Sequence, residues 1–440
     1  MPFLSIVGDL QLIIKILKSW IEQNPFLRSI NWKSGIEVGI RSVNLIYSHM
    51  ILLKLEIMSD EIDKLFKKHI YYNYFYLKRH LSLYSSANNH LMAEISGLIA
   101  ISSYFESPEL NKDREKWITL FEREINNQIL DDGVNMELSS RYHAEVTDQI
   151  LNSYLFAIRS NMTLSDIIIT KLKGLFNFID HTIGYGAIAE FGDSDDGHLV
   201  FPYFENDYSI YSSLLKSAHV QFNLNYANTP KKLDWRNYII YGENGFEVSK
   251  KIKSNNSLQN TLFKNGGYCF LYDEDTKLRL AMDVGNIGDN LSAAHGHSDI
   301  FHFTLDIKGI PLIIDTGTYQ YHERELFWRN YFRGVTAHNT LSINHQNQAT
   351  INNRMSWINR PEVKIIDYEL NKEITYCGAE HNGFSLYGFN HRRKFELDKK
   401  NRCIVINDEL IGSKTNNYPL FLYFHFHPDI RIKLKESKCY

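Results

Sequence analysis

The chain is poor in the residues that mark several protein classes. It has four cysteines in 440 residues, and Cys269, Cys377, Cys403 and Cys439 form no C-x-x-C pair. This spacing excludes a zinc ribbon and offers no evident disulfide framework. Only nine prolines are present, so long helical patterns run with few interruptions.

No charge of one sign dominates. Lys and Arg number 48 against 51 Asp and Glu, for a formal net charge of -3 without a long basic run. The sequence therefore predicts no nucleic-acid partner. The longest uncharged apolar stretch, near "SVNLIYSHMILL", is too short to cross a bilayer, so no membrane span is expected.

The first twenty residues, "MPFLSIVGDLQLIIKILKSW", lack the basic region and small-residue cleavage site of a signal peptide. Their spacing predicts a helix whose apolar side carries Leu12, Ile13, Ile16, Leu17 and Trp20. Aromatic residues, by contrast, are plentiful at 13%. They favour large cores, and beyond that they offer apolar faces that can stack on sugar rings.

The length predicts two domains, and the patterning changes in the middle. Helical apolar spacing marks the first half, in stretches such as "NNHLMAEISGLIAISSYF" and "ELSSRYHAEVTDQILNSYLFAIRS". From about residue 255 the segments are short, β-rich and bounded by Gly, Asn or Asp, as in "LRLAMDVG" and "RCIVINDELI". We expect an α+β protein with a helical domain at 1–220, a linker at 221–255 and an antiparallel β domain at 256–440.

Histidines gather in "SAAHGHSDIFHF", which holds His295, His297, His302 and Asp299. Downstream, Asp315 ends the apolar run "IPLIID" and His338 lies in "GVTAHNTLSIN". Two imidazoles and one carboxylate suit a zinc-type ion. We predict His297, Asp315 and His338 as its ligands; without a metal, these would be ordinary strand and loop side chains.

Strand parity leaves a competing ligand. A hairpin turning at residues 308–309 pairs Phe303 with Ile314 and puts His302 opposite Asp315.

His297 must then lie before the regular strand, where Gly296 can turn it inward. If it does not, His302 is the ligand instead.

Several motifs carry a resemblance to a known family. "HGHSDIFHFTLDIKGIPLIIDTGTYQY" followed by "RNYFRGVTAHNTLSIN" is similar to the β-domain signature of heparinase II/III-like polysaccharide lyases. Upstream, "NNHLMAEISGL", "ELSSRYHAEV" and "EFGDSDDG" resemble the family's toroid motifs, in the same order. The resemblance runs from about residue 10 to the end. It implies an incomplete (α/α) toroid, a β-sandwich-like domain, and one structural zinc-type ion per chain on the three predicted ligands.

The chain differs from the usual family pattern in two respects. Family members usually carry more helical residues before the segment matching "SWIEQNPF", and their β domain continues past "LYFHFHPDI". The resemblance thus leads us to expect a fragment or a shortened member of the family. The family suggests a periplasmic or secreted protein, although this chain shows no signal peptide.

The implied reaction is β-elimination at a uronic acid of an acidic polysaccharide. Removing the C5 proton builds charge on the adjacent carboxylate, which an enzyme must neutralise or hydrogen-bond. Asn89 and His90 stand at the matching positions, with Glu94 one turn on, where it can orient the imidazole. The alternative without a catalytic role is a polar helix start capped by Asn88.

Tyr142 matches the family's catalytic tyrosine, which takes the C5 proton and returns one to the leaving oxygen. A phenol with a pKa of about 10 needs nearby cations to act as a base, and His295 and Arg333 are candidates. His295 also matches the position of an alternative base. We expect it to meet Asn89, His90 and Tyr142 across the domain junction.

Arg329 and Arg333 are predicted to bind a uronate, since a guanidinium fork suits carboxylates; solvated arginines are the alternative. "EFGDSDDG" lacks a full calcium-loop ligand series and is interpreted as a structural loop.

Two other functions compete. A glycoside hydrolase would need paired carboxylates, for which Glu94, Glu137 and Glu190 are candidates. A non-catalytic carbohydrate-binding or polysaccharide-assembly protein could retain the fold. The sequence leaves open which polysaccharide is bound, whether action is endo or exo, and the oligomeric state.

Overall fold

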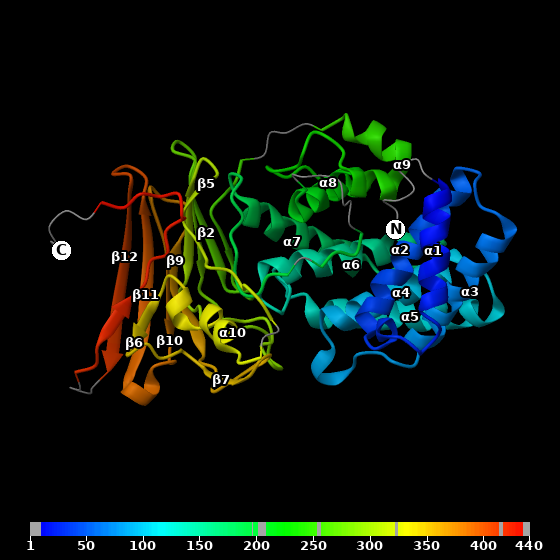
Figure 1. The fold of residues 1–440 in the computed structure, drawn as a ribbon. Helices are drawn as coiled ribbons and strands as arrows, with labels where there is room; N and C mark the ends of the chain where they lie inside the picture. Colours follow the sequence, from blue (N-terminus) through cyan, green and yellow to red (C-terminus); the bar gives the residue numbers. More distant parts are fainter. Residues whose placement is uncertain are drawn as a thin grey trace. The chain divides into compact units, whose positions relative to one another are not determined.

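The computed structural model describes residues 10–195, 197–200, 208–252, 257–321, 324–412 and 417–433. The chain divides into two compact units, coloured along the sequence in Figure 1. The helical unit comprises Met1–Asn135, Tyr142–Asp180 and Asp196–Asn256, and the β unit comprises Met136–Arg141, His181–Asp195 and Ser257–Tyr440. Two short segments of the first half thus belong to the β unit, which a contiguous domain at 1–220 does not anticipate.

The helical unit is built from successive helices, as the apolar spacing predicts. They are α1 (Leu10–Gln23), α2 (Gly35–Lys54), α3 (Asp60–Leu77), α4 (Asn89–Tyr104), α5 (Pro108–Gln128), α6 (Ser140–Arg159), α7 (Asp166–Ile183), α8 (Ile210–Phe222) and α9 (Trp235–Ser249). Side-chain caps start several of them. Ser59 accepts from the Ile62 backbone N–H at the start of α3, and Ser107 accepts from that of Leu110 at the start of α5.

Helix α2 packs tightly against α4. A Cβ on Gly39 would lie 2.3 Å from the Ala93 carbonyl oxygen, so this crossing requires glycine. Within the described residues, α2 is the one helix long and apolar enough to cross a membrane, but 56% of that window is buried inside the unit. Its buried face, including Val43 and Ile46, packs as that of a core helix does.

Helix α9 (15 residues) lies within the segment predicted as a linker. It begins after Asp234, whose carboxylate accepts from the Asn237 backbone N–H at 2.9 Å. The buried Arg236 and Ile240 anchor it in the helical unit. The polar composition of residues 221–255 hid this helix, because its buried side is itself partly polar.

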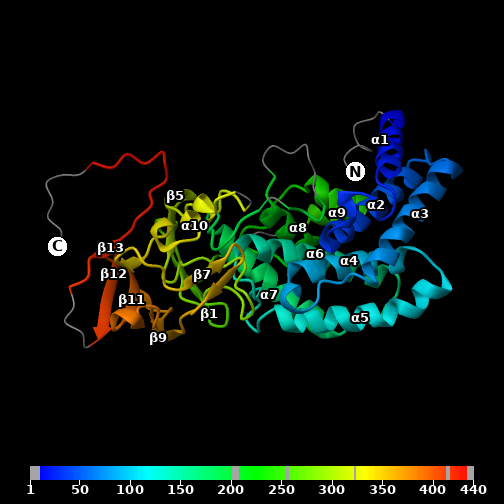
Figure 2. The ribbon, with the colours of Figure 1, turned by 60° about the horizontal axis from the view of Figure 1, so that its bottom comes forward.

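The β unit consists of two main antiparallel sheets, seen from two directions in Figures 1 and 2. The five-stranded sheet contains β1 (Thr261–Phe263), β2 (Tyr268–Asp273), β3 (Leu278–Asp283), β4 (Phe303–Ile307) and β5 (Ile310–Ile313) in that order. The four-stranded sheet has the order β12 (Cys403–Gly412), β11 (Phe389–Asp398), β10 (Ile374–His381) and β9 (Val363–Glu369).

Apolar side chains from both sheets share one core. Leu271 and Leu280 of the first sheet join Cys377 and Phe395 of the second in a single buried cluster. This is the sandwich-like packing that the family resemblance implies. Shorter elements complete the unit: α10 (Phe327–Phe332), β6 (Leu341–Ile343), which pairs with β13 (Leu420–Leu422), and β7 (Thr350–Asn353), which pairs with β8 (Ser356–Ile358).

The predicted hairpin at residues 308–309 is confirmed, but its register is not. Lys308 and Gly309 both have positive φ, and Ile307 pairs with Ile310 across the two-residue turn.

A register shift follows, so that Leu305 faces Ile313. The predicted pairing of Phe303 with Ile314 is therefore wrong, because a bulge inserts one extra residue in β5.

Candidate active site and metal centre

Helices α4 and α6 bring Asn89 and Tyr142 to the same level of the helical unit. The Ser96 hydroxyl lies 3.0 Å from the Gln149 carbonyl oxygen, which fixes the contact between the two helices. Each contact residue lies seven positions after its candidate catalytic residue, about 10 Å along the helix axis.

The two helices run in the same direction. The chain reverses direction between α4 and α5 and again between α5 and α6. Arg114 of α5 donates to the Ser102 carbonyl near the end of α4. Ile129, directly after α5, bridges to Asn135, whose N–H lies 3.2 Å from His143 Nδ1 in the first turns of α6. Asn89 and Tyr142 thus stand at one end of the helix pair, and both are buried.

The start of α4 combines a cap with the candidate residues. The Asn88 side chain accepts from the His90 backbone N–H at 3.2 Å, so the predicted cap is confirmed. Asn89 is buried and the His90 side chain is half-buried.

Glu94 does not take the position expected for it. Its fully buried carboxylate accepts from the Ser82 backbone N–H and hydroxyl, both at 2.6 Å. Burial raises its pKa, against the opposing effect of these hydrogen bonds. Glu94 therefore fastens the loop before α4 rather than the His90 imidazole, an arrangement that favours a structural role over a substrate contact.

The histidine loop of the β unit is held by internal hydrogen bonds. Asp289 accepts from the backbone N–H groups of Leu291, Ser292 and Ala293 at 2.6–3.2 Å. The Trp357 indole donates to the Gly296 carbonyl at 2.7 Å. These contacts fix the backbone on both sides of His295.

Asp193 joins both histidines of this loop. Its Oδ1 lies 2.8 Å from His297 Nε2, and its Oδ2 lies 3.2 Å from His295 Nδ1. The Arg329 guanidinium binds the same carboxylate through two nitrogens. Burial alone would raise the pKa of Asp193, but these partners hold it well below its usual range. Neighbouring Gly192 has a φ of +64°, and a Cβ there would lie 2.7 Å from the His295 carbonyl.

His295 stands between two buried carboxylates. Besides Asp193, the Glu137 carboxylate lies 3.5 Å from His295 Nε2. Burial lowers the pKa of His295, but Asp193 and Glu137 outweigh it and raise the value above the ordinary one. A cationic imidazole is thereby favoured in this enclosure.

His338 meets the predicted ligand Asp315. Its Nδ1 lies 2.7 Å from Asp315 Oδ2, while Asp315 Oδ1 accepts from the Gly317 N–H at 2.7 Å. Burial opposes ionisation of Asp315, yet the neighbouring histidines, His338 first among them, lower its pKa to about 2. His302 Nε2 lies 3.4 Å from Asp315 Oδ2.

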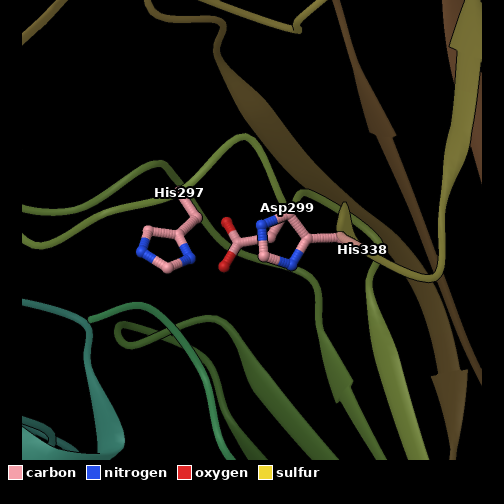
Figure 3. A group of neighbouring side chains, drawn as sticks. All are labelled: His297, Asp299 and His338. Carbon is pink, nitrogen blue, oxygen red and sulfur yellow. The ribbon is translucent and has the colours of Figure 1, made fainter. Parts of the chain in front are cut away.

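Two overlapping trios can hold a metal. One is His297, Asp299 and His338, drawn in Figure 3, and the other is His302, Asp315 and His338. All five residues are buried, and the ligand atoms within each trio lie within 4.8 Å of one another. The predicted set of His297, Asp315 and His338 draws on both trios and stays a prediction.

The donor chemistry of this cluster fits a zinc-type ion. His297 Nδ1 and His338 Nε2 are buried and make no hydrogen bond among the described residues. The other nitrogen of each ring faces a carboxylate and must carry the proton, which leaves a lone pair on the unbonded atom. A histidine whose second nitrogen donates to a carboxylate is the usual arrangement around a protein-bound metal.

The two predicted uronate-binding arginines are fully buried. Arg329 is engaged by Asp193, whereas Arg333 donates to the Arg354 and Asn353 carbonyls at 2.8 and 2.6 Å. Burial lowers the pKa of Arg333 to about 10. These contacts favour a role in holding loops over the predicted contact with substrate.

Sequence reasoning missed three carboxylates of the cluster. From the sequence, Asp193 is placed in a structural loop and Glu137 is considered only as a hydrolase candidate. Asp299 is noted in the histidine-rich stretch but has no predicted role. Asp299 had a local signal, since it lies two residues after His297 in the histidine-rich stretch. Asp193 and Glu137 had no local signal, because both are far from His295 in the chain. Asp193, the nearer of the two, is 102 residues away.

Comparisons with known proteins agree with the motifs. Residues 10–168 match the family model "Heparinase II/III N-terminus", and residues 256–440 match "Heparinase II/III-like, C-terminal". A heparin-sulfate lyase of Bacteroides stercoris is 26% identical over 352 residues, covering 77% of this chain and 46% of the relative. Its counterpart from Bacteroides thetaiotaomicron is 26% identical over 278 residues, covering 60% of this chain and 38% of the relative.

Solved structures share the fold. Heparan sulfate lyase HepC from Pedobacter heparinus superposes with a TM-score of 0.65 at 20% identity, covering 94% of this chain and 60% of that one. A crystal structure of heparinase III gives 0.67 at 19% identity, covering 92% and 59%. The chain thus spans less than half the length of these two curated relatives and about 60% of these solved chains. With both family models matched in order, the chain belongs to the heparinase II/III-like family.

Proposed function

We propose that the chain carries the catalytic residues of a polysaccharide lyase that cleaves a uronic-acid-containing acidic polysaccharide by β-elimination. The observation that carries this proposal is the pairing of Asn89 and Tyr142 at one end of α4 and α6. An amide that binds the uronate carboxylate and a phenol that moves the C5 proton are the two groups that elimination requires at close quarters.

Each candidate has a defined task. Asn89 and His90 hydrogen-bond the carboxylate, which stabilises the charge that develops as the C5 proton leaves. Tyr142 accepts that proton and returns one to the leaving oxygen at C4. His295, enclosed by Asp193 and Glu137, supplies positive charge. It serves as the alternative base when the C5 proton and the leaving oxygen lie on opposite faces of the sugar.

The zinc-type ion of this proposal is bound by His297 and His338, with Asp315 as the carboxylate ligand that the family resemblance implies. When bound, it supplies a fixed positive charge that links the loops carrying these residues. Its role is structural: His297 is two residues from His295, so a fixed His297 also fixes the backbone of the candidate catalytic histidine.

The test is incubation of the purified protein with a panel of uronate polymers, with heparan-type chains first because the curated relatives are heparin-sulfate lyases. Alginate-type and bacterial surface polysaccharides complete the panel. Ultraviolet absorbance of an unsaturated uronate supports elimination. New reducing ends without that absorbance would identify a hydrolase, and binding without cleavage would identify a carbohydrate-binding protein.

A further inference from the structure

Asp299 is a buried carboxylate with little to stabilise its charge. Its exposed fraction is 4%. Its own backbone N–H donates a hydrogen bond to the carboxylate. A buried charge that lacks hydrogen bonds is strongly unfavourable unless it is paired or binds a metal.

The surroundings of Asp299 supply a place for a cation. Figure 3 shows its carboxylate between the imidazoles of His297 and His338. The two rings lie 5.1 Å apart between centroids. A second carboxylate, that of Asp315, belongs to the same buried cluster through its contact with His338.

The hydrogen bonds decide which ring nitrogens can bind the cation. His297 donates through Nε2 to Asp193, and His338 donates through Nδ1 to Asp315, so His297 Nδ1 and His338 Nε2 keep their lone pairs.

His302 differs, because its Nδ1 accepts from the Asn339 backbone N–H at 2.9 Å. Its neutral ring then carries the proton on Nε2 and offers no free lone pair. This argues against His302 as the competing ligand.

We propose that Asp299 is a ligand of the metal ion, together with His297 and His338. The inference rests on the metal of the proposed function and adds a residue to it. With Asp315 as a further ligand, four protein groups surround the ion, which is the closed coordination of structural zinc sites. The short segment from His297 to Asp299 then contributes two ligands, so that metal binding orders the loop that presents His295.

The experiment compares the parental protein with Asp299→Asn, a change that keeps the shape and removes the charge. Metal-free protein is titrated with Zn²⁺ against a chromophoric chelator, and bound metal is counted by elemental analysis. We expect roughly one zinc per parental chain. Affinity in the variant should fall by more than the 10–100-fold typical of losing an outer contact of a metal site.

Asp283→Asn is the matched control. Asp283 is a buried aspartate on which the charge of Asp299 acts, and its Oδ1 accepts from the Gly285 N–H, a bond that an asparagine can keep. It belongs to neither metal trio. Its zinc affinity should stay within about threefold of the parental value.

Thermal unfolding separates a ligand from a merely structural residue. Without metal, Asp299→Asn should be at least as stable as the parent, because it removes a poorly compensated buried charge. Added Zn²⁺ should raise the melting temperature of the parent but not of the variant.

A variant that binds zinc like the parent would overturn the proposal, as would equal stabilisation of both proteins by zinc. A parental protein that binds no zinc would overturn the metal site as a whole. Neither result bears on the elimination reaction, which the polymer assay tests separately.

Discussion

Asp193 Oδ1 lies 2.8 Å from Nε2 of His297, although the two residues are 104 positions apart in the chain. The contact fastens the segment after α7 to the histidine loop. It also sets the tautomer of His297, since the nitrogen facing the carboxylate must carry the proton. The fully buried Arg329 binds both oxygens of the Asp193 carboxylate and holds it in place.

We expect Asp193→Asn to weaken both the fold and the metal site. The change leaves the Arg329 guanidinium buried without its counter-charge, which costs about 3–5 kcal/mol. Losing the carboxylate charge that His297 faces should lower zinc affinity by about 10–100-fold. Denaturant unfolding and chelator competition measure the two effects.

The double variant Asp193→Asn, Arg329→Met separates the effect on stability from the effect on zinc affinity. Removing both charges should recover part of the lost stability, because no unpaired buried charge remains, but zinc affinity should stay low. If the double variant regains parental zinc affinity, then Asp193 does not act on the metal through His297.

A second prediction distinguishes the two candidate imidazole ligands. His297→Ala should lose the bound zinc, because it removes the Nδ1 lone pair. His302→Gln should keep it, because the His302 lone pair is taken by the Asn339 N–H. Elemental analysis of protein purified without chelator measures both. Full occupancy in His297→Ala with loss in His302→Gln would reverse the assignment.

The fold could be predicted from the sequence where one apolar period dominates a segment. Helices such as α5 and strands such as β12 repeat one period clearly. Helix α9 could not, because polar groups such as Arg236 and Asn237 are buried along its inner side. The bulge beside Leu305 was equally hidden, since one inserted residue changes the register without changing composition.

The candidate site could be predicted only in part, for a different reason. Motifs identify Tyr142 and His297 because each lies in a recognisable local pattern. The partner of a buried charge carries no such pattern, because chain topology rather than spacing brings Asp193 to Arg329. For the same reason, the contacts of both arginines favour structural roles over the predicted substrate contacts, since each guanidinium is engaged by a carboxylate or by carbonyls inside the unit.

A third prediction concerns acid stability. His143 of α6 accepts from the Asn135 N–H through Nδ1, and its Nε2 lies 2.9 Å from the Leu175 carbonyl oxygen, so the ring is neutral. Burial lowers its pKa to about 4, against about 6.5 in the unfolded chain. Between these values the unfolded state binds the extra proton, so stability falls as pH drops from 6.5 towards 4, by about 1.4 kcal/mol per pH unit.

His143→Gln removes this titration. Its unfolding free energy, followed by the helical circular dichroism signal, should depend less steeply on pH than that of the parent across that window, by about the same amount per unit. Above pH 7 the offset between the two proteins should be constant. Identical slopes between pH 4.5 and 6 would show that His143 is not the group responsible.

The last prediction tests Tyr142 as the group that moves the proton. Tyr142→Phe keeps the ring and its packing in α6 and removes the transferable proton. Turnover of a cleaved uronate polymer, followed by the absorbance of the unsaturated product, should fall by about a hundredfold or more, with substrate binding and melting temperature nearly unchanged.

Tyr154→Phe is the matched control, because it makes the same chemical change on the same helix at a ring packed against Phe222, 5.4 Å between centroids. The control should retain parental turnover. A Tyr142→Phe protein with parental turnover would place base and acid elsewhere, and His295, held by Asp193 and Glu137, would be the next residue to substitute.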